Sequence, residues 1–237
     1  MPPVTPGHPD AAVEVDAPPQ IPLPRMPPPA VRRDEEPGGA ELSGIAQARV
    51  RESAQRNATA ADLFETGRVD EAVLLFEQAL ASCRSTLGGE HPDTLTVAGN
   101  LGVAYVAAGN RRKGLKLITS NLAARVRVLG DTHPSTLAAR NALAAAHRIT
   151  GDADTAVSLA KQVVMQRTRA LGSTHLDTLR SRMGLALALA AAGDLTSAHR
   201  LLASTMSDAE ESLGAEHEYT VAFVECGEAA GLLRREV

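Results

Sequence analysis

The chain has 237 residues and a net charge of −4; 44% of its residues are apolar but only 2% are aromatic. An apolar fraction built from Ala, Leu and Val suits closely packed helices better than a β-sandwich or barrel. No basic block is present that would recruit nucleic acid by bulk electrostatics.

The short apolar runs, the N-terminal sequence and the isolated cysteines together favour a cytoplasmic protein. The apolar runs are well under the roughly 20 residues of a membrane span, and the N-terminus lacks an apolar signal core. Cys83 and Cys226 are isolated in the sequence, so neither a disulfide framework nor a zinc knuckle is expected. We therefore expect a protein of the reducing cytoplasm with no membrane partner.

The first segment, residues 1–40, carries 12 of the 14 prolines, including the run "PPQIPLPRMPPP". Such a stretch cannot donate regular backbone hydrogen bonds and favours polyproline II or disorder. The composition predicts a disordered tail. The alternative is a recognition segment for a partner with a groove.

From residue 41 onward the sequence repeats. The motif "LGGEHPDTL" at 87–95 recurs as "LGDTHPSTL", "LGSTHLDTL" and "LGAEHEYTV", each 42 residues after the one before it. A second series of turn glycines has the same period of 42 residues, at Gly67, Gly109, Gly151 and Gly193, and a small residue follows each glycine five positions later. Two series with one period indicate an internal repeat. Residues 41–237 are therefore one domain of about four and a half 42-residue units.

Each unit reads as helix A, a glycine turn, helix B and then the LGxxHxxT joint, because apolar residues recur at helical spacing on both sides of the glycine. The predicted A helices are 42–66, 93–108, 135–150, 177–192 and 219–234. The predicted B helices are 69–87, 111–129, 153–171 and 195–213.

The repeated motif can be interpreted as a joint that connects helix B to the next helix A. Gly88 can adopt the left-handed conformation that ends helix B, and Pro92 stiffens the start of the next helix, where a missing N–H does no harm. Asp93 or Thr94 can cap the first free N–H groups of that helix.

The four histidines of the joints invite a metal-site hypothesis. Equivalent positions on stacked units lie at least one helix spacing apart, roughly 8–10 Å, whereas zinc needs its nitrogen ligands about 2 Å away. We therefore expect hydrogen-bonded structural histidines, with no metal and no cofactor. The structural positions of the joints are Gly88, His91, Thr94, Gly130, His133, Thr136, Gly172, His175, Thr178, Gly214, His217 and Thr220.

A helix, a turn with glycine, a small residue five positions later and a second helix, repeated head to tail, resemble a tetratricopeptide repeat. The 42-residue unit with "LGxxHPDTL" resembles the kinesin light chain subclass, which is also common in bacterial proteins. The resemblance implies an all-α fold: a right-handed superhelix of stacked antiparallel helix pairs, with the A helices on the concave side. Gly114 in place of the small alanine and Leu176 in place of the proline depart from the pattern.

The geometry of that family also implies a binding groove. Its positions fall thirteen, ten, six, three and two residues before each turn glycine. On this chain we assign to the groove Asn57, Ala61, Phe64, Val103, Val106, Asn141, Ala145, Arg148, Met183, Leu187, Ala190 and Glu225.

The sequence contains no catalytic motif: no phosphate loop, no His-Glu-x-x-His, no Gly-x-Ser-x-Gly and no Cys-x-x-Cys. The leading hypothesis is a non-enzymatic scaffold that binds a protein or peptide segment in the groove. One alternative is a regulatory subunit that senses a small ligand or a signalling peptide; another is an enzyme on a helical-repeat scaffold. The partner could also be a second copy of the chain, which would form a homo-oligomer.

Overall fold

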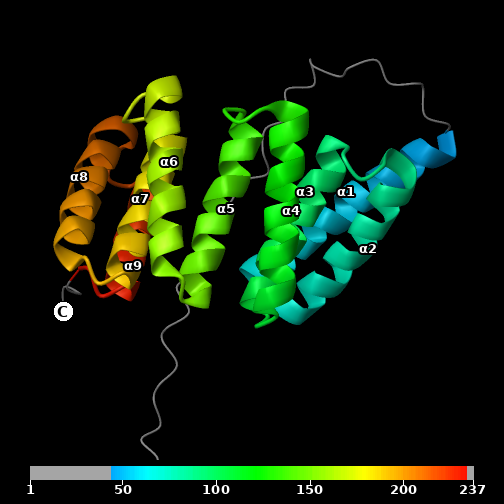
Figure 1. Ribbon diagram of the computed structural model, residues 1–237, viewed down its shortest axis with the longest axis horizontal. Helices are drawn as coiled ribbons and strands as arrows, with labels where there is room; N and C mark the ends of the chain where they lie inside the picture. The colour runs from blue at the N-terminus through cyan, green and yellow to red at the C-terminus, as the bar shows by residue number, and fades with distance from the viewer. Residues whose placement is uncertain (1–43, 234–237) are drawn as a thin grey trace, which may run out of the picture.

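The structure of the protein is a computed structural model that describes residues 44–233, and within that range every regular element is an α-helix (Figure 1). The predicted Pro-rich tail, residues 1–40, lies outside the described residues. The helices are α1 (Gly44–Glu65), α2 (Val69–Leu87), α3 (Pro92–Ala107), α4 (Arg111–Leu129), α5 (Pro134–Thr150), α6 (Ala153–Leu171), α7 (Leu176–Ala191), α8 (Leu195–Leu213) and α9 (Glu218–Ala229).

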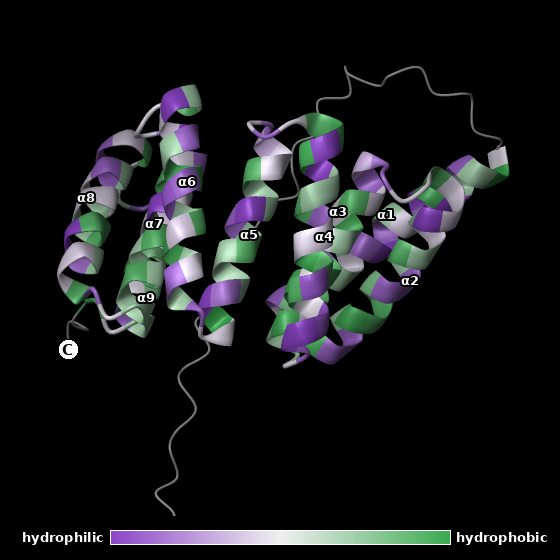
Figure 2. Cartoon of the chain, in the orientation of Figure 1, coloured by the Kyte–Doolittle hydropathy of each residue, from purple (hydrophilic) through white to green (hydrophobic). Residues whose placement is uncertain are grey.

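Consecutive helices pack against each other along the whole array, and the odd-numbered A helices also touch the next A helix, as α1 with α3, α3 with α5 and α5 with α7. The even-numbered B helices form the outer layer and show both hydrophilic and hydrophobic residues in Figure 2. The predicted all-α solenoid of stacked antiparallel helix pairs is confirmed.

The four B helices begin and end at the residues predicted from the sequence, because each is bounded by glycine turns at both ends. The last A helix differs from its prediction of 219–234. It ends at Ala229, since Gly231 takes a φ of 68° and the N–H groups of Leu232 and Leu233 turn back to the carbonyl of Gly227. Leu232 is then buried in the core.

The joints place their histidines as helix caps. In each joint the ring Nδ1 accepts a hydrogen bond from the backbone N–H two residues later, at 3.1 Å for His133 and 3.2 Å for His91. The same bond measures 3.2 Å at His175 and 3.3 Å at His217. The predicted cap was therefore wrong: the cap is the histidine, not Asp93 or Thr94. The Thr94 side chain is buried, and its hydroxyl has no hydrogen-bond partner.

The glycines that end the B helices have a positive φ, but they are not left-handed helical as predicted. Gly88 has φ 89° and ψ 166°, and Gly130 has φ 90° and ψ 165°. This extended region with positive φ is accessible almost exclusively to glycine. Its extended ψ carries the chain away from helix B toward the next A helix, which a left-handed helical residue would not do.

Small residues lie where the two helices of a unit face each other. A Cβ added to Gly114 would meet Val106 Cγ2 at 2.6 Å and the carbonyl oxygen of Gly102 at 2.7 Å. The backbones of α3 and α4 therefore approach more closely than a methyl group on α4 allows. The sequence departure at Gly114 follows from this contact.

We expect His133→Ala to lower the free energy of unfolding by about 1 kcal/mol, because the first N–H groups of α5 lose their side-chain acceptor. His133→Asn should retain most of the stability, since Asn is an efficient N-cap. Urea unfolding followed by circular dichroism measures both variants. Equal losses in the two variants would contradict a capping role.

We expect Gly114→Ala to lower the free energy of unfolding by about 1–3 kcal/mol, because the methyl group would collide with the backbone of α3. Gly99→Ala is the matched control. A Cβ added at Gly99 meets only the side chain of Asn121, with Oδ1 at an ordinary 3.5 Å. The higher helix propensity of Ala should therefore raise the free energy of unfolding of this variant by up to about 1 kcal/mol. A Gly114→Ala variant as stable as the parent in urea would refute the close approach.

Candidate functional site

The A helices enclose a cavity of about 680 Å³. It receives side chains from α1, α3, α5, α7 and α9, and from the B helices only Phe76, Ile118 and Ala160 reach it. The groups that surround the cavity are thus brought together from positions more than 160 residues apart in the sequence, from Ala54 to Tyr219.

The structure places nine of the twelve residues assigned to the groove on the wall of this cavity. They are Asn57, Ala61, Phe64, Val103, Val106, Asn141, Ala145, Arg148 and Leu187. The residue six positions before the turn glycine lines the cavity in all four units that contain such a glycine.

The other three residues assigned to the groove lie elsewhere. Met183 is fully buried, with 0% of its surface exposed, in the same apolar cluster as Phe223 of α9, so it cannot line a groove. Ala190 packs partly buried against that cluster. Glu225 is exposed on α9 and does not contribute to the cavity wall.

Several cavity residues were missed by the sequence assignment. Arg180 and Glu65 stand thirteen and two residues before their turn glycines, so the same spacing could have found them. Asn100 lies nine residues before Gly109, one position away from the expected register. Tyr219 reaches the cavity from the first turn of α9, and no repeat position signals it.

One side of the cavity, built by α1 to α4, is mainly apolar. Phe64, Val103, Val106 and Ile118 contribute to it. The polar groups on this side are Asp62 and Glu65 of α1 and a pair of amides, in which Asn100 Nδ2 donates a hydrogen bond to Asn57 Oδ1 at 3.1 Å.

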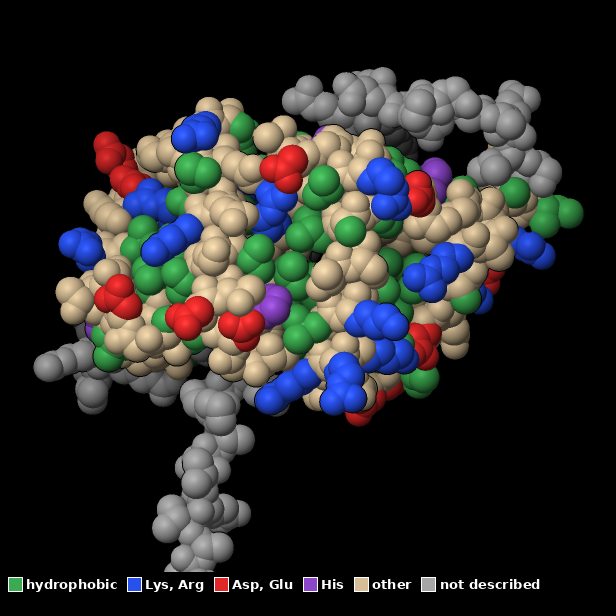
Figure 3. All heavy atoms as spheres, in the orientation of Figure 1, with side chains coloured by type: hydrophobic (Ala, Val, Ile, Leu, Met, Phe, Trp, Pro, Cys, Tyr) green, Lys and Arg blue, Asp and Glu red, His purple; other side chains and the backbone are tan. Residues whose placement is uncertain are grey.

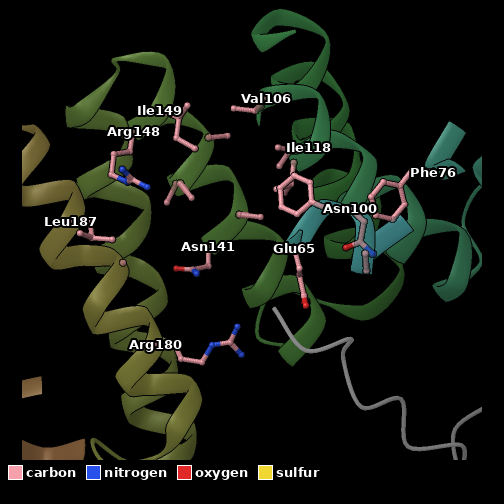
Figure 4. Close-up of a pocket in the computed structure, with 18 of the residues that line it drawn as sticks. Glu65, Phe76, Asn100, Val106, Ile118, Asn141, Arg148, Ile149, Arg180 and Leu187 are labelled. Carbon is pink, nitrogen blue, oxygen red and sulfur yellow. The ribbon is translucent and has the colours of Figure 1, made fainter. Parts of the chain in front are cut away.

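The opposite side, built by α5, α7 and α9, combines small and apolar residues with polar and charged ones. Figure 4 shows Asn141 and Arg148 of α5 and Arg180 of α7 across the cavity from Phe76, Asn100 and Ile118. The Arg180 guanidinium lies 5.3 Å from the centre of the Tyr219 ring and 3.7 Å from Asp177 Oδ1.

Arg148 is the most unusual polar group on this side. It is half-buried, and burial lowers the pKa of its guanidinium from the ordinary value, while the nearby Cys226 acts in the opposite direction. A cation in this place is held at a cost in hydration free energy.

A basic cluster lies outside the cavity, at the start of α4. Arg111, Arg112 and Lys113 are exposed there, and the first turn of the helix has no acidic residue. Lys113 Nζ is 3.1 Å from Glu77 Oε1 and 3.9 Å from the centre of the Tyr105 ring. Figure 3 shows Lys and Arg side chains gathered toward one end of α4. These contacts tie α4 to its neighbours, and the rest of the cluster forms a solvated charged face.

Profiles of the tetratricopeptide repeat family match residues 51–117, 136–177 and 178–219. The chain belongs to the tetratricopeptide repeat family. Two solved structures of a putative kinesin light chain from Podospora anserina with nearly identical TPR-like repeats, one of them a point variant, are similar to this chain. Each is 31% identical, with a TM-score of 0.62 over 77% of this chain and 88% of that chain. No curated protein matches significantly.

Tetratricopeptide repeats generally mediate protein–protein interaction, and their scaffolds are typically non-enzymatic. Within residues 44–233 no group of His, Cys, Asp and Glu side chains could hold a metal ion. Over the same residues, each helix falls short of the length or hydropathy of a membrane span.

Because burial disfavours the charge of Arg148 and no described carboxylate or hydrogen-bond acceptor pairs with it, we expect Arg148→Met to raise the free energy of unfolding by about 0.5–2 kcal/mol. Arg167→Met is the matched control. Its buried guanidinium donates to the carbonyl of Asp177 at 2.9 Å and to Ser181 Oγ at 2.8 Å, so its replacement should destabilise the protein. Urea midpoints that fall in both variants would show that Arg148 is paired in solution.

Proposed function

We propose that this tetratricopeptide repeat protein is a non-enzymatic scaffold that binds an extended segment of a partner protein in the cavity between its A helices. The observation that carries the proposal is the cavity itself, which draws its lining from five A helices. A curved array of helix pairs offers such a surface without any catalytic group.

The chemistry of the lining suits a peptide. Small side chains such as Ala61 and Ala145 leave room for the side chains of a bound segment, and a volume of about 680 Å³ can enclose several of them. The amides of Asn57, Asn100 and Asn141 can both donate to and accept from a peptide backbone. Apolar pockets then select the side chains, while the amides hold the main chain.

The charges of the cavity disfavour nucleic acid as a partner. Its three carboxylates, those of Asp62, Glu65 and Glu218, outnumber the guanidinium groups of Arg148 and Arg180, so a phosphate backbone would on balance be repelled. We extend the proposal to protein partners in general, a second copy of the chain included. The free, buried Cys83 and Cys226 suit a reducing compartment, and we propose a cytoplasmic location.

We expect Ala145→Trp to abolish the binding of peptides selected on the full-length protein from a random phage-displayed library. The indole would fill the middle of the cavity, because Ala145 lies on its wall in the central unit. Ala170→Trp is the control, since Ala170 is an exposed alanine of α6 that is not part of the cavity wall.

Fluorescence anisotropy with labelled selected peptides measures the affinities, and circular dichroism confirms that both variants remain helical. If Ala145→Trp binds these peptides as tightly as the parent, the binding surface lies elsewhere. A library that yields no binding peptide would refute peptide binding by the cavity.

A further inference from the structure

The buried arginines of this protein have their guanidinium groups satisfied. Arg125 donates to Asn121 Oδ1 at 3.0 Å, and Arg167 donates to Ser181 Oγ at 2.8 Å. Arg140 donates to Gln166 Oε1 at 2.8 Å and also contacts Asp131. Arg182 of α7 donates to Asp208 Oδ2 at 2.5 Å. Each of these groups has found the acceptor that a desolvated cation requires.

Arg148 is the exception. Among residues 44–233, no side chain or carbonyl accepts a hydrogen bond from its guanidinium, and no carboxylate pairs with it. It is nevertheless half-buried on the wall of the cavity. Five N–H donors in a planar fork are therefore available to whatever occupies this space.

A second polar side chain near Arg148 also lacks a hydrogen-bond partner among the described residues. The side-chain amide of Asn141, two turns earlier on α5, also forms no hydrogen bond with a described residue, and its Oδ1 faces Gly184 of α7. Arg180 adds a second cation to this side of the cavity (Figure 4). These two side chains without described hydrogen-bond partners, Arg148 and Asn141, thus both lie on α5, and Arg180 of α7 adds positive charge beside them.

The α1 side of the cavity carries the opposite charge. Asp62 and Glu65 line it and are exposed, and next to them lie the apolar Phe64 and Val103. An acidic group would be repelled at α1 and attracted at α5 and α7, whereas an apolar group fits against Phe64.

We propose that the segment bound in the cavity carries an acidic side chain whose carboxylate pairs with the Arg148 guanidinium, with its apolar residues toward α1 and α3. The inference deepens the proposed function and rests on it. The carboxylate accepts two parallel N–H bonds from the guanidinium, and the Asn141 amide can donate a further bond to the carboxylate or to the backbone beside it. The charge asymmetry fixes one direction of binding, because the reversed segment would place its acid beside Asp62.

The test uses the full-length protein and a random phage-displayed peptide library as the probe. Peptides are selected on the parent, on Arg148→Gln and on Arg169→Gln, in which the replaced arginine is exposed on α6 and lies outside the cavity wall. The tightest parental peptide is then made twice, once as selected and once with its acidic residue changed to the corresponding amide. Anisotropy gives the affinity of both peptides for all three proteins.

We expect the parent and Arg169→Gln to select apolar peptides with an Asp or Glu, and Arg148→Gln to lose that preference. Changing the acid to an amide should weaken binding to the parent about 10- to 100-fold, as expected for a charged hydrogen bond. The same change in the peptide should have little effect on its affinity for Arg148→Gln, because the substitution in the peptide and the substitution in the protein remove the same interaction.

Selection of peptides without acids, or an acid-to-amide effect that persists in Arg148→Gln, would overturn the inference while leaving peptide binding intact. A library that selects no peptide at all would overturn the proposed function and this inference together.

A separate experiment tests the direction in which the segment binds. With a spin label placed beside the acidic residue of the peptide, the methyl resonances of Leu187 on α7 should broaden more than that of Ala61 on α1, since both residues line the cavity at opposite ends. Stronger broadening at Ala61 would show that the segment binds the other way round.

Discussion

The close packing of each A helix on its B helix, seen most directly where the backbones of α3 and α4 meet at Gly102 and Gly114, is the constraint on which the array depends. The A helices present Ala60, Gly102, Ala144 and Ala186 at intervals of 42 residues, and the B helices present Ala72, Gly114, Ala156 and Ala198 at the same intervals; all eight are buried. Because these positions have no side chain beyond Cβ, the paired helices can pack closely along their length. Each pair then becomes a rigid unit whose remaining apolar faces must be covered by the next pair.

The features that recur with the 42-residue period were also the ones that the sequence could predict. The B helices lie between two glycines whose φ is positive at every occurrence, so their boundaries could be read to the residue. The end of α9 was predicted wrongly because no further turn glycine of the series lies beyond Gly193, and the irregular Gly231 ends the helix instead. The capping role of His91 was missed because histidine is not among the usual N-cap residues, and only its ring position reveals the bond to Asp93.

Counting back from the glycines found nine residues that line the cavity, in α1, α3, α5 and α7. It failed at Met183 because α9 and the chain after it bury that part of α7, and a count within one helix contains no information about neighbours. Tyr219 could not be found for the related reason that it enters the cavity from a helix start. Contacts between units therefore limit what a repeat pattern can predict about a site.

Periodicity also separates two kinds of unsatisfied polar group in this protein. The buried hydroxyls of Thr94, Thr136, Thr178 and Thr220 have no hydrogen-bond partner in any of the four joints, so this feature belongs to the repeat itself. Arg148 has no such equivalents. The position three residues before the turn glycine holds Phe64, Val106, Arg148 and Ala190 in successive units.

A desolvated cation that occurs once, at a position where the other units carry apolar side chains, is not required by the packing of a helix pair. The three units without an arginine there form the same A and B helices, so the fold is complete without it. Its retention inside a cavity, beside an amide that is also unpaired, is explained if the energetic cost of Arg148 is recovered on binding. The repeat thus supplies the shape of the cavity, and the residues that break the repeat determine which ligand it can recognise.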